Sequence, residues 1–64
     1  AILSWMASEK RIQEVRKMLE RKGYVFDRIH GSHYIFLKPG APNVVVPVHG
    51  GKVKSCYVRK IEKI

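Results

Sequence analysis

The sequence predicts an α+β domain in which one three-stranded antiparallel sheet is covered on one face by two helices. Three observations lead to this fold class: a helical pattern over residues 8–22, three strand-like runs between residues 24 and 48, and a second helical pattern after residue 54. A chain of 64 residues is long enough for one small domain. The predicted order is helix, strand, strand, strand, helix, which is a two-layer arrangement.

The first helix is predicted from the spacing of its apolar residues. Between Ser8 and Lys22 these are Ile12, Val15, Met18 and Leu19. Ser8 is the expected N-cap, and Gly23 supplies the left-handed residue that ends the helix. We expect residues 1–7 to be an N-terminal extension and residues 8–64 to form the single domain.

Three strands are predicted from runs rich in β-branched and aromatic residues, at 24–29, 33–38 and 44–48. Gly31 and Ser32 form a gap of hairpin length, so the first two strands should be antiparallel. A Pro- and Gly-rich turn at 39–43 precedes the third strand. Pro47 cannot donate to a ladder, so this strand should lie at a sheet edge, with the second strand in the centre.

The last helix is expected to begin with Ser55 as its cap and to turn Val58 and Ile61 inward. In the central strand, Tyr34 and Phe36 share one face, while His33 and its alternate neighbours share the other. Both faces carry apolar residues, so the sequence leaves open which of them meets the helices.

The composition predicts a polyanionic partner. The chain has 13 Lys and Arg residues against five acids, a net charge of +8. No apolar run approaches the roughly 20 residues of a membrane span, so no membrane partner is expected. Cys56 is the lone cysteine, which excludes an internal disulfide and favours a reducing, cytoplasmic setting. A domain this small has marginal stability, so a partner chain is also expected.

Basic residues at strand ends and before the last helix predict phosphate contacts. They are Arg28, Lys38, Lys52 and Lys54. The start of a helix offers free N–H groups and the positive end of its dipole. Gly50 and Gly51 would let a phosphate approach the backbone, and His49 beside them is a binding candidate. Any single lysine can simply be solvated, but the set with few acids favours nucleic acid.

His33, directly after Gly31 and Ser32, is the candidate acid–base group. An imidazole can take or give a proton near neutral pH. RNA carries its own nucleophile, the 2′-OH, so a base that removes this proton can drive cleavage without a metal. The Gly-Ser pair would let the nucleic-acid backbone come close. Most turn histidines have no catalytic role. His30 and His49 are competitors for the second position of an acid–base pair, but either could equally be a solvated loop residue, which is the preferred interpretation for His30.

No metal or other cofactor is expected. The candidate ligands are His30, His33, His49 and Cys56, and their spacing matches no usual zinc pattern. Cys56 more often packs as a small apolar residue early in a helix.

The residues from Glu9 to Ile64 resemble the HicA (YcfA-like) toxins of toxin–antitoxin systems. The most specific parts are Gly31-Ser32-His33 and the run VPVHGGK at residues 46–52. The resemblance implies a fold like that of double-stranded-RNA-binding domains (dsRBD-like) and an mRNA endoribonuclease. It implies that His33 is the catalytic histidine, and that an antitoxin, HicB, covers the active site.

Two other functions remain open at this point. One is a non-catalytic module of the same fold that binds RNA. The other is a small interaction domain whose charge serves an acidic protein. Replacing His33 would separate a nuclease from an RNA-binding module, and the salt dependence of binding would separate a nucleic-acid binder from a protein-binding domain.

Overall fold

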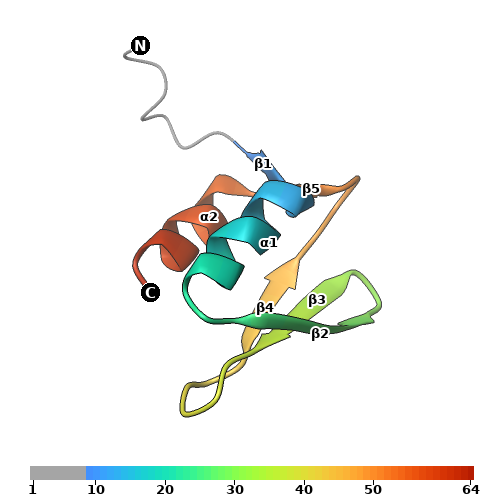
Figure 1. Ribbon diagram of the computed structural model, residues 1–64. Helices are drawn as coiled ribbons and strands as arrows, with labels where there is room; N and C mark the ends of the chain where they lie inside the picture. The colour runs from blue at the N-terminus through green and yellow to red at the C-terminus, as the bar shows by residue number, and fades with distance from the viewer. Residues whose placement is uncertain (1–8) are drawn as a thin grey trace.

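The computed structural model describes residues 9–64 and contains all the predicted elements (Figure 1). Its helices and strands are β1 (Lys10–Arg11), α1 (Ile12–Arg21), β2 (Val25–His30), β3 (His33–Leu37), β4 (Val44–Pro47), β5 (Lys52–Val53) and α2 (Ser55–Glu62). β2, β3 and β4 form an antiparallel sheet with β3 in the centre, as predicted. Both helices lie on one side of this sheet (Figure 1), so the α+β, dsRBD-like arrangement is confirmed.

The first helix starts later than the sequence predicts. Arg11 is its N-cap, with extended dihedral angles of φ −70° and ψ 148°. Residues 10 and 11 are not helical because they form β1, which pairs with the two residues of β5. The predicted cap Ser8 and the predicted extension at residues 1–7 lie outside the described residues.

The end of α1 is confirmed, and its hydrogen bonds explain it. Gly23 has a φ of 93°, which residues with a side chain rarely adopt. Its N–H donates to the carbonyl of Glu20 at 3.0 Å, and the N–H of Tyr24 donates to the carbonyl of Leu19 at 3.0 Å. This pair of bonds is a Schellman motif, and Tyr24 is buried against the core behind it.

The register of the sheet settles which face meets the helices. Tyr34 and Phe36 lie on the covered face, where Phe36 is fully buried and pairs with Phe26 and Val44 across the strands. The ring of Phe26 meets that of Phe36 edge-on, with centroids 5.7 Å apart. The residues of β3 that alternate with them therefore face away from the helices.

Pro47 ends β4 at the edge of the sheet, as predicted. In the last helix, Val58 and Ile61 are buried as expected, but the N-cap is Lys54 and Ser55 is already helical. The core joins both helices to the covered face and to β5. Its largest fully buried side chains are Phe36, Leu19, Val15, Val46, Val53 and Val58.

Candidate active site

The side of the sheet that faces away from the helices carries the candidate histidine. Directly paired residues in an antiparallel ladder point to the same face. We call this side the open face, and its residues are Val25, Arg28, His30, His33, Ile35, Leu37, Val45 and Pro47. Val25 is 65% exposed and Val45 is 49% exposed. Within residues 9–64, no helix covers this side of the sheet, so it is accessible to a large ligand (Figure 1).

His33 is exposed at the first position of β3, opposite His30 on one side and Pro47 on the other. The turn before it has a positive φ of 64° at Gly31 and a negative φ at Ser32, the pattern of a type II′ hairpin turn. A Cβ added at Gly31 would meet nothing within 4 Å. The turn is therefore open on the side where a substrate backbone would approach His33.

Arg28 lies on the open face, but it already has an acidic neighbour. The ladder between β2 and β3 shifts between Phe26 and Arg28, which leaves Asp27 as the extra residue of a β-bulge. The carboxylate of Asp27 pairs with the guanidinium of Arg28. The Arg28 side chain is 60% exposed, so it can still meet a phosphate, in competition with this carboxylate.

The run from His49 to Lys52 is a tight hairpin turn. His49 and Lys52 exchange two backbone hydrogen bonds of 3.0 Å, and Gly50 and Gly51 have φ values of 59° and 75°. Two consecutive positive φ values are those of a type I′ turn, which explains both glycines. We call this segment the glycine turn. Its outer side is open, because a Cβ at either glycine would meet nothing within 4 Å.

Lys52 and Lys54 lie on either side of the buried Val53, directly before α2. The first turn of α2 contains no acidic residue, and no side chain among residues 9–64 caps its start with a hydrogen bond. The positive end of the helix dipole and two exposed lysines therefore occupy the same place, as predicted.

Two further basic residues belong to this region, and the sequence analysis did not identify them. The pairing of β1 with β5 places Lys10 opposite Val53 and Arg11 opposite Lys52. Glu9, Lys10, Arg11, Glu14 and Lys52 line one hollow of about 400 Å³. We call Lys10, Arg11, Lys52 and Lys54 the basic cluster. Local periodicity could not reveal it, because the pairing joins residues more than 40 positions apart.

Lys38 does not join the other candidates. It follows the last residue of β3, five residues from His33, which corresponds to about 17 Å along a strand. Its ammonium lies over the ring of Tyr24, 5.5 Å from the centroid. This contact is a cation–π interaction that supports the end of the sheet remote from the histidines.

The two motif segments are held together by the backbone. The N–H of Val48 donates to the carbonyl of Ser32 at 2.8 Å, so the chain leaving β4 is tied to the turn before His33. The N–H of Ile12 donates to the carbonyl of Gly51 at 2.9 Å, which ties the glycine turn to the start of α1. The structure thus connects His33, the glycine turn and the basic cluster through neighbouring backbone segments.

The candidate metal ligands do not converge. Among residues 9–64, no three His, Cys, Asp or Glu side chains gather closely enough to hold a metal ion. Cys56 is exposed on α2, which corrects the expectation that it packs as a small apolar residue. Tyr34 is half-buried on the covered face, with its ring 5.9 Å from that of Phe26, so it is not a stacking surface on the open face.

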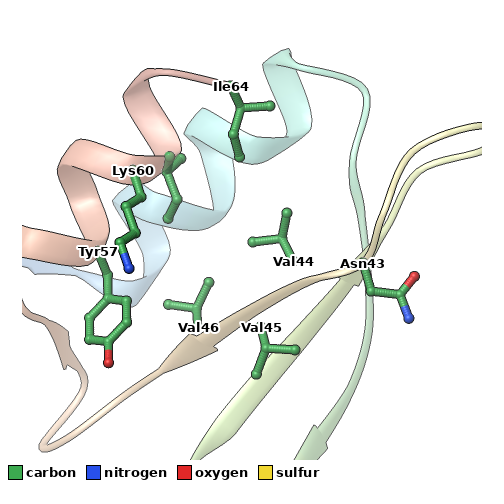
Figure 2. A pocket seen from close by; sticks show the side chains of 8 residues that line it. Asn43, Val44, Val45, Val46, Tyr57, Lys60 and Ile64 are labelled. Carbon is green, nitrogen blue, oxygen red and sulfur yellow. The ribbon is translucent and has the colours of Figure 1, made fainter.

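A separate apolar groove lies between β4 and α2 (Figure 2). It has a volume of about 220 Å³, and Val44 and Val46 line it from the strand while Tyr57 and Ile61 line it from the helix. Lys60 reaches over the ring of Tyr57, 5.6 Å from its centroid. None of the candidate catalytic or phosphate-binding residues lines this groove.

No helix in the described part of the chain is long and apolar enough to cross a membrane. A family model described as "HicA toxin of bacterial toxin-antitoxin" matches residues 12–64, which is most of the chain. Comparisons with curated proteins and with solved structures find no significant match.

Proposed function

Because the chain belongs to the HicA toxin family of bacterial toxin–antitoxin systems, we propose that it is a metal-independent endoribonuclease that cleaves mRNA with His33. The observation that carries this proposal is the position of His33: exposed on the open face, directly after an open turn. A toxin acts on a component its host needs, and the charge of +8 favours a polyanionic one such as mRNA.

In the proposed reaction, the imidazole of His33 transfers a proton as general base or general acid. Removal of the 2′-OH proton lets that oxygen attack the adjacent phosphorus, and the bond from phosphorus to the 5′-oxygen breaks. The products are a 2′,3′-cyclic phosphate and a 5′-OH end. A positioned acid–base group of this kind contributes about 10²–10⁴ in rate.

Cationic groups and backbone N–H groups would hold the RNA and stabilise the negative charge that develops at phosphorus. Gly31 and Ser32 would admit the backbone beside His33, and Arg28 would meet a neighbouring phosphate on the open face. Lys52, Lys54 and His49 would bind further phosphates at the glycine turn and the start of α2. Lys38 lies at the remote end of β3, so its contact would be with a distant nucleotide and not with the reacting one.

Membership of a toxin–antitoxin family implies an antitoxin partner. We propose that this partner is a HicB-like protein with an acidic surface that covers the open face and His33. An uncovered nuclease with this charge would endanger its own cell, and opposite charges would speed the association. Cytoplasm is the proposed location, because mRNA is found there.

The test compares His33→Gln with the wild-type chain and with Asn43→Ser, which alters an exposed residue directly before β4, at the end of the sheet remote from His33. Each protein is mixed with a labelled mRNA transcript in EDTA. We expect His33→Gln to lower the cleavage rate by about 10²–10⁴ while RNA binding in a gel-shift assay changes by less than about threefold. Asn43→Ser should cleave like wild type. A His33→Gln chain that cuts as fast as wild type would show that the catalytic assignment is wrong.

A second candidate is a non-catalytic RNA-binding module, favoured by the basic cluster on the side of the helices. Such a module would bind RNA through phosphates and leave it intact. The same experiment separates the two, because the module would show binding in the gel-shift assay and no 2′,3′-cyclic phosphate ends.

A further inference from the structure

His30 and His33 face one another across the turn between β2 and β3. They are directly paired in the ladder, and both are exposed. Directly opposed residues have Cβ atoms about 4.5–5.5 Å apart and side chains on the same face. The sequence suggested a solvated loop position for His30, but the strand continues through it. Two imidazoles therefore stand side by side on the open face.

We propose that His30 is the second acid–base group, so that His30 and His33 act together on one RNA phosphodiester. This inference rests on the function proposed above. That reaction needs two proton transfers, one from the attacking 2′-oxygen and one to the departing 5′-oxygen. A single imidazole near one of these oxygens leaves the other transfer to water, whereas two imidazoles on directly paired residues can serve both.

The proton balance of the step is complete. The neutral imidazole accepts the 2′-OH proton as the bond from the 2′-oxygen to phosphorus forms. The imidazolium gives its proton to the 5′-oxygen as the bond from phosphorus to that oxygen breaks. The products are the cyclic phosphate and the 5′-OH end, and no water, metal or oxidant is consumed. Proton exchange with solvent then restores the starting protonation states of the two rings.

His49 is the competing histidine, and its position argues against it. It lies in the glycine turn, beyond the end of β4, where it pairs with Lys52. It is not opposite His33 in any ladder, because the residue of β4 that pairs with His33 is Pro47. His49 is therefore left with the binding role proposed for it.

The surroundings of the pair are sparsely charged. From β2, Arg28 faces the same side as His30, and its guanidinium is paired with Asp27. From β4, Pro47 brings no charge. A phosphate between the two rings would therefore meet one cation, Arg28, whose charge is partly neutralised by Asp27. The groups that can transfer protons to and from the RNA at this place are the two imidazoles.

The experiment uses an RNA oligonucleotide that contains a cleavage site mapped with the wild-type chain. It is made in two forms: with the natural linkage, and with sulfur in place of the departing 5′-oxygen. Thiolate leaves without a proton, so loss of the general acid is rescued on the sulfur substrate and loss of the general base is not. Single-turnover rates are measured for wild type, His30→Gln, His33→Gln and the double variant between pH 5 and 9.

We expect His30→Gln to slow cleavage of the natural substrate by about 10²-fold or more. Of the two single variants, one and only one should recover on the sulfur substrate. The wild-type rate should pass through a maximum with pH, and each single variant should lose one limb of that profile. The double variant should be little slower than the slower single variant, because two groups that act as a unit are not additive.

Thermal melting by circular dichroism establishes that each variant is folded, and His30→Thr, which suits a strand, replaces His30→Gln if that variant melts early. If the His30 variant cuts at the wild-type rate with the wild-type pH profile, the pair is wrong while His33 stands. If it is slow on both substrates with both limbs retained, its role is structural and the pair is again wrong. A wild-type chain that leaves RNA uncut overturns the proposed function, and the pair with it.

Discussion

The N–H of Val48 donates to the carbonyl of Ser32 at 2.8 Å, which joins the residue before the glycine turn to the turn that precedes His33. The two residues lie 16 positions apart in the sequence, and their bond extends the ladder between β3 and β4 beyond the pair of His33 and Pro47. The position of the histidine turn therefore depends on the conformation of the chain that leaves β4. Substitutions in the glycine turn should therefore alter the position of the turn that precedes His33.

The first prediction concerns the conformation of the glycine turn. Gly50→Val places a β-branched residue at a φ of 59°, so it should lower the free energy of unfolding by about 1–2 kcal/mol. Gly50→Asn creates an Asn-Gly turn, which is favoured in type I′ hairpins, and should cost less than about 0.5 kcal/mol. Urea denaturation measures both values.

Hydrogen exchange provides a second reading of the same pair of variants. In Gly50→Val the amide of Val48 should exchange faster than in wild type, because its bond to Ser32 loosens with the turn. Equal destabilisation by valine and asparagine would contradict the type I′ assignment.

The second prediction tests the register of β4 with two adjacent valines. Val45 is 49% exposed on the open face, whereas Val46 is 1% exposed on the covered face. Val45→Lys should change the free energy of unfolding by less than about 0.5 kcal/mol. Val46→Lys places an unpaired ammonium in the core and should cost several kcal/mol, enough to unfold a domain of this size.

Urea denaturation followed by circular dichroism measures this pair. Each variant is the control for the other, because the same substitution is made at neighbouring positions of one strand. A one-residue slip of β4 would exchange the two results.

The third prediction concerns the phosphate contacts of the basic cluster. RNA affinity should fall steeply with salt, and the double variant Lys52→Gln/Lys54→Gln should flatten the plot of log affinity against log salt. For single-stranded RNA the slope should shrink by about 0.7 for each lost contact, or about 1.4 for the two. Fluorescence anisotropy at several salt concentrations measures it.

Lys63→Gln is the control for position, because it makes the same substitution at the C-cap of α2, at the other end of that helix. Its slope should stay close to the wild-type value. If Lys63→Gln alone flattens the slope by as much as the double variant does, the phosphates are not held at the start of α2.

The sequence was informative wherever a single segment determines its own structure. The spacing of Ile12, Val15 and Leu19 predicts α1 and its buried stripe, and Gly23 predicts its end. Pro47 predicts that its strand lies at the edge of the sheet, because a residue without an N–H is not tolerated in a central strand. Each of these inferences needs only local sequence and elementary backbone geometry.

The sequence was uninformative where distant segments decide the structure. The sequence pattern places Lys10 and Arg11 in the predicted helix, but in the structure they are extended because they pair with β5. The choice between the two faces of β3 depends on how the helices dock. The pairing of His30 with His33 could have been inferred from the two-residue turn, which fixes the register of the strands it joins.

The ladder between β1 and β5 encloses nearly the whole fold, since the chain passes through α1 and the sheet before it returns. Closing so long a loop costs conformational entropy, and the few hydrogen bonds of two short strands offset little of that cost. We therefore expect this ladder to form late in folding and to open before the core does. Its opening would separate Lys10 and Arg11 from β5 while Val53, Phe36 and their neighbours stay packed in the core. The rate at which the ladder between β1 and β5 opens therefore sets how often the basic cluster separates and forms again while the rest of the domain stays folded.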